Sequence, residues 1–462
     1  MNKKRIGIWG FGKVGKSAVS YFLHKNYAIE VLDKRELTAQ EKMFLEKHNI
    51  AYRRQKNLEQ FLQRNYIILP SPGIDLRNFQ RYEQKFICEL DILQKEFCKP
   101  IIGITGSVGK TTITNIVDQT LQSQSINVWT GGNIGTPMLN LIKEKDYVDN
   151  IDIALLELSS FQLDLCKIFC PDIAVWTNFF PNHLDRHTNL DAYFQAKKKL
   201  IINQNKNQYA LLPIEIIDTL QPLEQYKSKI YFFSNKRPTD NLIKKLRTKD
   251  QLLYAQKNKI FKISRHDNTE TEIATIDNSD NFIFQENLLI IYSIFYIIKK
   301  YYELSETNLQ KLKLQQLEHR LEKFCTINGI VFYNDSKSTT PASTIAAVKK
   351  LSDKPIILLL GGLSKGVDRS PLIKKIKPYV KRIVSFGKES EILKKLCNNE
   401  NIPCSSFKKL QQAVIYSFTY AVTGDQILLS PSGSSFDLFE NYILRGNHFK
   451  QVVRQIKELQ LR

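Results

Sequence analysis

The stretch Ile101-Ile102-Gly103-Ile104-Thr105-Gly106-Ser107-Val108-Gly109-Lys110-Thr111-Thr112 decides the fold of this chain. It predicts a buried strand that runs into a glycine turn, a lysine and two hydroxyl residues that open a helix. In such a turn, backbone N–H groups close around a polyphosphate, Lys110 reaches its terminal oxygens, and Thr111 can ligate the accompanying Mg²⁺. The helix adds its positive end to the same place. The stretch therefore predicts a phosphate-binding loop of a shortened Gly-x-x-Gly-Lys-Thr form on an α/β sheet.

Length and composition indicate a globular protein of several domains. A chain of 462 residues is too long for one hydrophobic core, and its hydrophobic fraction of 42% comes without a low-complexity run. The formal net charge of +21 could mark a nucleic-acid surface or a phosphate-rich ligand, or have no functional role. We favour the last interpretation, because the lysines are spread along the whole chain without an arginine-rich arm or zinc-finger spacing. We therefore expect no nucleic-acid partner.

The cysteines and the N-terminus favour a cytoplasmic location. The seven cysteines are odd in number and form no Cys-x-x-Cys unit, so we expect reduced thiols. Cys166 and Cys170 could share a helix face as metal ligands, but without a second pair nearby a core or surface role is the simpler interpretation. The basic start, residues 1–5, leads into an apolar run broken at Gly7 and Gly10. This pattern predicts neither a signal peptide nor membrane insertion.

Residues 1–94 predict a small Rossmann-like domain. A strand from Arg5 leads to Gly10-Phe11-Gly12-Lys13-Val14-Gly15, then a helix to about Lys25 and a strand over 29–32 that ends in Asp33. A glycine turn with an acid about twenty residues later is the dinucleotide fingerprint, but many nucleotide-binding units carry it. The acid can bind a ribose or a base. A strand over 66–69 ends in Pro70-Ser71-Pro72-Gly73, at the sheet edge where ligands bind.

Two further α/β domains are predicted, over residues 95–316 and 317–462. In the central one, strands over 126–130, 153–157 and 173–177 alternate with helices, the stretch 203–281 carries short strands, and a helix over 282–300 closes the domain. In the last one, strands over 329–333, 355–360 and 426–429 each deliver polar residues at the carboxyl end. The fold class is therefore α/β, with a Rossmann-like N-terminal domain, a P-loop ATPase-like central domain and a Rossmann-like C-terminal domain.

Four polar residues of the central domain are candidates for chemistry. Glu157 ends a buried strand, where a carboxylate beside a phosphate loop holds Mg²⁺; the alternative is an ordinary acid at a helix start. His183 lies in a turn crowded with polar side chains, which favours function over a structural role. Asn133, in Gly131-Gly132-Asn133-Ile134-Gly135, is either a ligand contact or part of a plain turn. Lys197, one of three consecutive lysines, would by itself be assigned to a solvated helix face.

Taken together and in order, these motifs resemble those of the Mur ligases. The stretches that carry the resemblance are Gly106-Ser-Val-Gly-Lys-Thr, Gly131-Gly-Asn-Ile-Gly, Glu157-Leu-Ser-Ser-Phe-Gln-Leu, Asn178 with His183-Leu-Asp-Arg, Leu317-Glu-His-Arg-Leu-Glu, Asn334-Asp-Ser-Lys-Ser-Thr, Gly361-Gly-Leu-Ser-Lys-Gly and Arg445-Gly-Asn. The short N-terminal unit with Ser71-Pro72-Gly73 is most similar to the family member that adds D-glutamate to UDP-N-acetylmuramoyl-L-alanine. The resemblance implies an ADP-forming ligase of peptidoglycan synthesis in the cytoplasm that uses ATP and two Mg²⁺ ions through an acyl phosphate. We expect it to act as a monomer.

The resemblance also implies roles for individual residues. For the UDP substrate these are Lys13, Val14, Asp33, Lys34, Ser71, Gly73, Asn133 and His183. For ATP they are Gly106, Ser107, Val108, Gly109, Lys110, Thr111, Thr112, Asn287, Arg320, Asp335 and Lys337. The implied metal ligands are Thr111, Glu157, His183 and Lys197, the last as a carbamylated lysine, and the implied catalytic set is Lys110, Glu157, His183 and Lys197. The implied glutamate pocket is Thr339, Lys365, Ser435, Phe436 and Tyr442.

The chain departs from the family pattern at four of these places. Val108 and Phe284 stand where the family has Asn, Asn182 replaces an acid beside His183, and Lys34 replaces a hydroxyl residue near the uracil. These departures bear on adenine and uracil geometry and leave the implied catalytic set intact.

Three other functions remain open at this point. A nicotinamide-dependent oxidoreductase would use the first glycine turn and Asp33, but would give Lys110 and Glu157 no role. A nucleic-acid-binding ATPase would use the positive charge. Folylpolyglutamate synthesis follows the same acyl-phosphate chemistry with a substrate that lacks UDP. The sequence by itself does not determine the stereochemistry of the amino acid.

Overall fold

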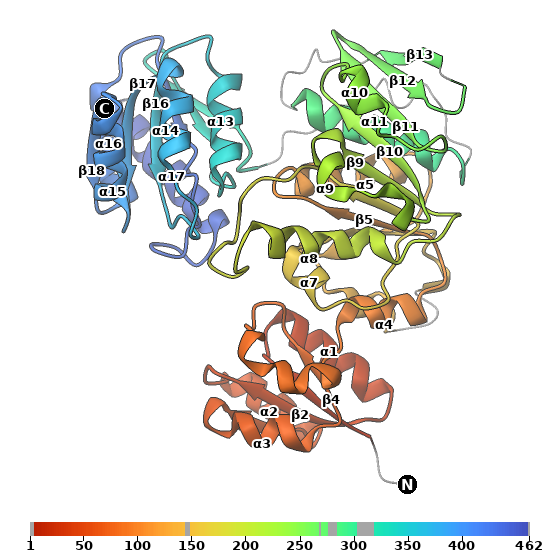
Figure 1. Ribbon diagram of the computed structural model, residues 1–462. Helices are drawn as coiled ribbons and strands as arrows, with labels where there is room; N and C mark the ends of the chain where they lie inside the picture. The colour runs from red at the N-terminus through yellow and green to blue at the C-terminus, as the bar shows by residue number, and fades with distance from the viewer. Residues whose placement is uncertain (1–3, 144–147, 268, 276–283, 303–317, 461–462) are drawn as a thin grey trace. The chain divides into compact units, whose positions relative to one another are not determined.

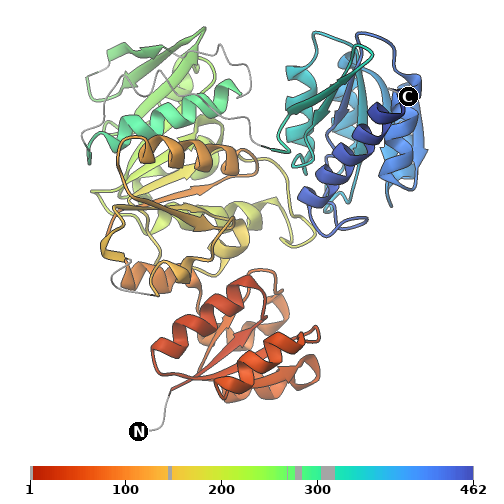
Figure 2. The same cartoon turned by 180° about the vertical axis from the view of Figure 1, so that it is seen from behind.

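A computed structural model describes residues 4–143, 148–267, 269–275, 284–302 and 318–460 (Figures 1 and 2). The chain divides into two compact units, Met1–Phe179 with Asp191–Leu312, and Phe180–Leu190 with Lys313–Arg462. The boundary predicted at 316/317 lies outside the described residues. The segment 180–190, which carries His183, belongs to the second unit although the chain on either side of it belongs to the first.

The first unit begins with a four-stranded parallel sheet of order β3-β2-β1-β4. Its strands are β1 (Arg5–Trp9), β2 (Ala28–Asp33), β3 (Ala51–Arg54) and β4 (Ile67–Pro70), and its helices are α1 (Lys13–His24), α2 (Ala39–Lys47) and α3 (Leu58–Arg64). Helix α1 turns Ala18, Val19 and Phe22 into the core, while Thr38 and Glu41 form a capping box at the start of α2. Because the strands are parallel, their carboxyl ends meet at one edge, as the sequence predicts.

A nine-stranded sheet follows, in the order β13-β12-β11-β10-β9-β8-β5-β7-β6. Its strands are β5 (Ile101–Thr105), β6 (Val128–Gly132), β7 (Ile153–Glu157), β8 (Ile173–Trp176), β9 (Tyr209–Pro213), β10 (Lys229–Ser234), β11 (Gln251–Gln256), β12 (Lys259–Ser264) and β13 (Thr269–Thr275). In this order, all strands from β11 through β5 to β6 run parallel to their neighbours. Strands β12 and β13 pair antiparallel and form one edge of the sheet. The stretch that the sequence left as short strands therefore extends the central sheet.

Helices connect and cover these strands (Figure 1). They are α4 (Glu89–Glu96), α5 (Lys110–Gln122), α7 (Ser160–Asp164), α8 (Leu190–Ile202), α9 (Ile217–Leu220), α10 (Asp240–Ile243) and α11 (Gln285–Ile298). Short 3₁₀ helices are η1 (Gln55–Asn57), η2 (Arg77–Lys85), η3 (Met138–Asn140), η4 (Ile214–Ile216), η5 (Leu223–Gln225) and, in the second unit, η6 (Lys377–Tyr379). Strand β5 is buried over its whole length, as a continuous apolar run in a parallel sheet predicts.

The second unit is built on a six-stranded sheet of order β14-β15-β19-β16-β17-β18, in which only β14 is antiparallel to its neighbour. The strands are β14 (Glu322–Ile327), β15 (Ile330–Asn334), β16 (Ile356–Gly361), β17 (Val380–Phe386), β18 (Cys404–Phe407) and β19 (Gln426–Leu429). The helices are α13 (Pro341–Lys350), α14 (Ser370–Ile376), α15 (Ser390–Asn399), α16 (Leu410–Tyr420) and α17 (Tyr442–Gln460). Helices cover both faces, with α13 and α14 in front of the sheet in Figure 1 and α17 in front of it in Figure 2.

Two predictions about the whole chain can be compared with this fold. All seven cysteines lie in described parts of the chain and are free thiols. No helix among the described residues is both long enough and apolar enough to cross a membrane.

Candidate active site

The phosphate-binding loop lies between β5 and α5, at the carboxyl edge of the central sheet. Gly109 takes a φ of +84°, a left-handed conformation that favours glycine, and a methyl group there would come within 3.0 Å of Asn287 Oδ1. The Lys110 ammonium folds back and donates to the Gly106 carbonyl at 2.8 Å. Lys110 and Asn287, which are 177 positions apart in the sequence, therefore both belong to the surroundings of one loop.

The backbone of this loop is held by a side chain from the end of β8. Asn178 Oδ1 accepts from the Val108 N–H at 3.0 Å, and Asn178 Nδ2 donates to the Val108 carbonyl at 3.2 Å. Ser107 Oγ lies 3.1 Å from the Tyr193 hydroxyl. Val108 lacks the amide of the family pattern, but its backbone is fixed by these bonds.

Lys197 lies beneath the loop and not on a solvated helix face. Its side chain, on α8, is 1% exposed, and Nζ donates to Thr105 Oγ1 and to the Gly106 carbonyl, each at 3.1 Å. Burial holds the pKa of this amine well below its usual range, the Lys110 charge lowers it further, and Glu157 opposes the shift. The charged form of this amine is therefore less favourable here than in water.

Glu157 ends β7 in the same sheet and has one unsatisfied oxygen. The residue is 2% exposed; Oε1 accepts from Asn133 Nδ2 at 2.8 Å, and the Asn133 N–H donates to the Glu157 carbonyl, also at 2.8 Å. Oε2 is buried without a hydrogen-bond partner among the described residues. A buried carboxylate oxygen without a donor is costly, and a cation is the ligand that would compensate it.

In the N-terminal sheet, the predicted UDP-binding residues gather around the first glycine turn. Asp33 Oδ2 accepts from the Phe11 N–H at 2.7 Å, so this buried carboxylate holds the turn in shape. Gly10 has a φ of +94°, and a methyl group there would come 2.7 Å from Ser71 Oγ. Lys13 and Lys34 are exposed beside this turn. Whether Asp33 also contacts a uridine stays a prediction.

In the second unit, polar residues converge where β15, β16 and β19 end. Asp335 Oδ2 accepts from Ser430 Oγ at 2.8 Å and Oδ1 from the Leu321 N–H at 3.1 Å, and burial raises the pKa of this carboxyl to about 6. The Lys337 ammonium lies 4.8 Å from the centre of the Tyr442 ring. The predicted nucleotide residue Lys337 and the predicted glutamate residue Tyr442 are thus direct neighbours.

The remaining predicted glutamate residues differ in exposure. Ser435 is 3% exposed, whereas Phe436 on the same loop is 71% exposed. The Lys365 carbonyl accepts from the Asp185 N–H at 3.3 Å, which joins the segment of His183 to the loop after β16. His183 itself has a φ of +56° and accepts from the N–H groups of two residues that follow it, so it heads a tight turn.

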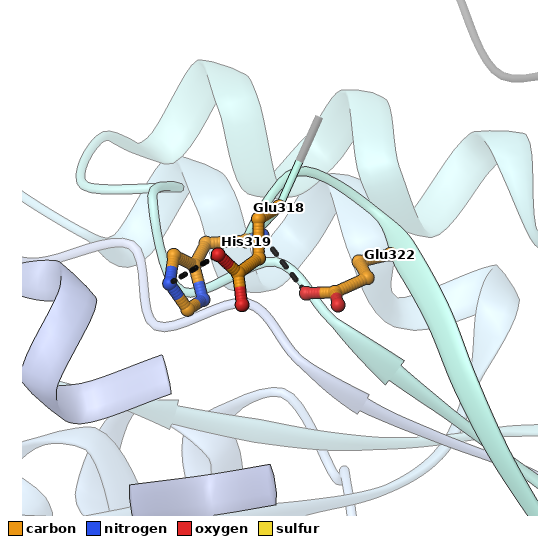
Figure 3. Close-up of side chains that lie close together, drawn as sticks. All are labelled: Glu318, His319 and Glu322. Carbon is orange, nitrogen blue, oxygen red and sulfur yellow. Dashed lines mark hydrogen bonds and ion pairs between the residues drawn. The ribbon is translucent and has the colours of Figure 1, made fainter. Parts of the chain in front are cut away.

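Glu318, His319 and Glu322 form a cluster near the start of the second unit (Figure 3). The His319 N–H donates to Glu322 Oε2 at 2.9 Å, and Lys450 pairs with both glutamates, with its Nζ 3.1 Å from Glu322 Oε1. Asn334 Nδ2 donates to His319 Nδ1 at 2.9 Å, so the other ring nitrogen carries the proton. Because Lys450 pairs with both carboxylates and His319 Nδ1 accepts from Asn334, these groups already have protein partners, and the cluster anchors the segment that bears Arg320.

The structure thus assembles the predicted residues in groups. In the first unit it gathers Gly106, Lys110, Glu157, Lys197, Asn133 and Asn287 near the phosphate loop, and Lys13, Asp33 and Ser71 near the first glycine turn. In the second unit, Asp335, Lys337 and Lys365 lie on loops that follow β15 and β16, and Tyr442 begins α17. Thr105 and Tyr193 were missed, because a threonine inside a strand and a tyrosine on a helix give no sequence signal.

Comparison with known proteins places every part of this chain in related proteins. Residues 4–84 match the Mur ligase MurD-like N-terminal domain, residues 104–283 the Mur ligase middle domain, and residues 319–433 the Mur ligase glutamate ligase domain. The UDP-N-acetylmuramoylalanine--D-glutamate ligase of Pseudothermotoga lettingae is 31% identical over 453 residues, 97% of each chain. The enzyme of the same name from Petrotoga mobilis is 30% identical over 98% of this chain and 100% of its own.

Solved structures share the fold at much lower identity. A pseudomurein peptide ligase type C from Methanothermus fervidus superposes with a TM-score of 0.58 at 15% identity, covering 98% of this chain and all of its own. The MurF ligase from Thermotoga maritima in complex with ADP gives a TM-score of 0.56 at 16% identity, covering 88% of this chain and 92% of its own.

Proposed function

The chain belongs to the Mur ligase family, and from that premise we propose that it joins D-glutamate to UDP-N-acetylmuramoyl-L-alanine with cleavage of ATP to ADP and phosphate. The substrates are proposed from the names of relatives that align with nearly the whole chain. The chemistry is proposed from one observation, the convergence of Lys110, Lys197 and Glu157 around the Gly106 loop. From the family resemblance we further propose that the reaction belongs to peptidoglycan synthesis in the cytoplasm and that the protein works as a monomer.

The residues near the phosphate loop fit the divalent cations that this chemistry requires. The orphaned Oε2 of Glu157 is a hard oxygen ligand, and Thr111 occupies the hydroxyl position of the loop. Glu157 and Thr111 would hold one Mg²⁺, and a carbamylated Lys197 would hold the second, for which the family resemblance also implies His183. When bound, the ions neutralise the repulsion between the substrate carboxylate and the γ-phosphate.

Lys197 fits the carbamate hypothesis because a buried neutral amine is a nucleophile. Its lone pair attacks the carbon of CO₂, an N–C bond forms, and one N–H proton leaves to solvent. The product is an anion at a position where the ammonium form would repel a cation. Thr105 Oγ1, now 3.1 Å from Nζ, would remain as a hydrogen-bond partner that orients the group.

In the proposed reaction, the alanyl carboxylate attacks the γ-phosphorus, an O–P bond forms, and the bond to ADP breaks. Lys110 and the backbone N–H groups of the loop stabilise the charge that develops on the transferred phosphoryl group. The glutamate amine then attacks the activated carbonyl of the acyl phosphate. A C–N bond forms, phosphate departs with the former carboxylate oxygen, and the amine proton passes to solvent.

Mass spectrometry tests this function directly. The protein is incubated with ATP, Mg²⁺, UDP-N-acetylmuramoyl-L-alanine and either D- or L-glutamate, and the UDP product is examined for one added glutamyl residue. We expect the mass increase with the D-isomer and the formation of ADP and phosphate in equal amounts. AMP and pyrophosphate would contradict the acyl-phosphate route, and the absence of a glutamyl product would contradict the substrate assignment.

A further inference from the structure

Arg369, which is buried, and Glu389, which is partly exposed, form an ion pair beside the loop 361–366 in the second unit. Arg369 is 3% exposed and lies just before α14, and Glu389 lies just before α15. Arg369 Nη2 is 3.3 Å from Glu389 Oε2. No role has been assigned to either residue above.

The pair binds the loop at three places that precede Lys365. Arg369 donates from Nη2 to the Gly362 carbonyl at 2.7 Å and from Nη1 to the Gly361 carbonyl at 3.2 Å. Glu389 Oε1 accepts from the backbone N–H of Ser364 at 3.0 Å and from its hydroxyl at 3.3 Å. The cation therefore holds the start of the loop, and the anion holds the residue next to Lys365.

The conformation that these bonds enforce is one that lysine avoids. Lys365 has a φ of +55°, in the left-handed region where a Cβ atom crowds the backbone. Such a residue persists when its surroundings over-determine it, and this is typical of ligand-binding loops. Bonds to 361, 362 and 364 supply that constraint.

The same network reaches the loop after β19. Leu363 and Ser434 exchange backbone hydrogen bonds of 3.0 and 2.9 Å. A methyl group on Gly433 would lie 2.5 Å from Arg369 Nη2, so the guanidinium packs directly against that loop as well. The loops of Lys365 and Ser435 are thus fixed to each other and to the pair.

Stability alone is a poor explanation for this pair. Burial lowers the pKa of Arg369, with Glu389 and Asp437 opposing the shift, and Arg369 Nε has no hydrogen-bond partner among the described residues. Apolar replacements of a buried ion pair are often as stable as the pair itself. Its geometric effect is specific, because its two charged groups bind positions 361, 362 and 364 of a single loop.

We propose that Arg369 and Glu389 are positioning residues for the amino-acid substrate, which hold the 361–366 loop so that Lys365 presents its ammonium to a substrate carboxylate. This inference rests on the proposed function. The pair does not touch substrate. Glu389 balances the Arg369 charge, so the pair adds little net charge of its own beside Lys365.

Steady-state kinetics test the proposal through a split between Michaelis constants. Glu389→Ala removes the ion pair and the acceptor for Ser364, and we expect the KM for D-glutamate to rise about tenfold or more. Glu389→Gln keeps an acceptor and should have a smaller effect. The KM values for ATP and the UDP substrate should stay within about twofold, because other loops bind them. An unchanged glutamate KM in an active Glu389→Ala enzyme overturns the proposal.

The first unit offers a matched control. Arg247 is also buried against an acid, with Nη2 2.8 Å from Asp250 Oδ1 and 3.0 Å from the Ser228 carbonyl. Asp250→Asn should lower stability and leave the glutamate KM unchanged. An equal rise of the glutamate KM in Asp250→Asn and Glu389→Ala would mean that the loss of any such ion pair has this effect. That result would overturn the specific role of Arg369 and Glu389.

Two further measurements separate this proposal from the proposed function. In a Lys365→Met background, Glu389→Ala should add little to the glutamate KM, because the pair acts through Lys365; a full additional rise overturns that route. Hydrogen exchange of the unliganded protein needs no reaction, and Glu389→Ala should accelerate exchange over 361–366. Unchanged exchange overturns the proposal, whereas a wild-type protein that adds no glutamate contradicts the proposed function only.

Discussion

The phosphate-loop region of the first unit and the strand-end loops of the second unit differ in how their buried charged groups are paired. Around the phosphate loop, Glu157 keeps an oxygen without a donor among the described residues, and burial lowers the pKa of Lys197 well below its usual range. In the second unit, Arg445 is fully buried, yet it donates to Ser336 Oγ, the Ser336 carbonyl and the Gly433 carbonyl at 2.7–3.1 Å. The Glu157 oxygen can gain a bond from a bound ligand, whereas Arg445 is already bonded by the protein itself.

This difference indicates how work is divided between the units. Incomplete groups gain most from charged ligands, so the phosphate-loop region is where the charge of the reaction should be stabilised. Self-satisfied groups add rigidity and hold loops, so the second unit should set amino-acid affinity and selectivity. Substitutions in the first region should therefore lower kcat, and those in the second should raise the KM for the amino-acid substrate.

The largest effect is expected at Lys110. Lys110→Ala removes a cation whose charge is most useful when the phosphoryl group is in transfer, and kcat should fall by about a hundredfold to a thousandfold. Phosphate release in the presence of all three substrates measures it. A rise in the KM for ATP with kcat unchanged would assign Lys110 to ground-state binding and would break the contrast between the regions.

Lys197→Ala is expected to lower kcat by about a hundredfold, because it removes the position of the proposed carbamate. Short carboxylic acids should partly restore activity by placing an anion in the space left by the side chain. Lys198→Ala and Lys199→Ala, which change the next two lysines on α8, are the controls and should stay active. Full activity of Lys197→Ala without an added acid would refute the carbamate.

Lys365→Met sharpens the comparison from the side of the second unit. The side chain keeps its length and loses its charge, so the KM for D-glutamate should rise about tenfold or more while kcat changes less. The KM for the UDP substrate, measured on the same enzyme, should be unchanged. Lysine as amino-acid substrate should react poorly with the wild type, because its distal ammonium would face Lys365; turnover equal to that with glutamate would refute the pocket.

The sequence predicts the fold well where local patterns determine it. The buried run into the phosphate loop, the glycine turn near Gly10 and the polar ends of three C-terminal strands all lie where periodicity and turn residues indicate. The α/β class and family membership are confirmed. The predicted domain limits and the roles of site residues stay predictions.

Tertiary contacts decided what the sequence could not. Lys197 looks like a solvated lysine, because nothing in three consecutive lysines reveals that the first one points under a loop 91 positions away. Arg369 and Glu389 are ordinary charges in the sequence, and only the fold joins them. The grouping of segment 180–190 with the second unit likewise depends on long-range packing.

The smallest effect concerns another incomplete group of the first unit, Glu89 at the start of α4. Its carboxyl is 4% exposed and lines a small hollow with Pro70, Pro72, Met138 and Phe161, and Oε1 has no hydrogen-bond partner among the described residues. Burial raises its pKa to about 8, against a hydrogen bond from the Leu139 N–H. Below that pH the folded protein keeps a proton that the unfolded chain releases near pH 4.5.

Stability should therefore decline as pH rises between about 5 and 8, by at most about 1.4 kcal/mol per pH unit from this group, because the folded state binds more protons than the unfolded one. Glu89→Gln cannot titrate and keeps an acceptor for the Leu139 N–H. Its free energy of unfolding, measured in urea, should therefore increase relative to that of the wild type as the pH rises over that range. Glu89→Leu should show the same relative increase with pH, but its free energy of unfolding should be lower throughout, because it loses the acceptor. Parallel wild-type and Glu89→Gln curves would show that Glu89 is ionised in the folded protein and already has a compensating partner. In that case the contrast between the two regions would rest on Glu157 and Lys197 alone, the two groups that face the phosphate loop itself.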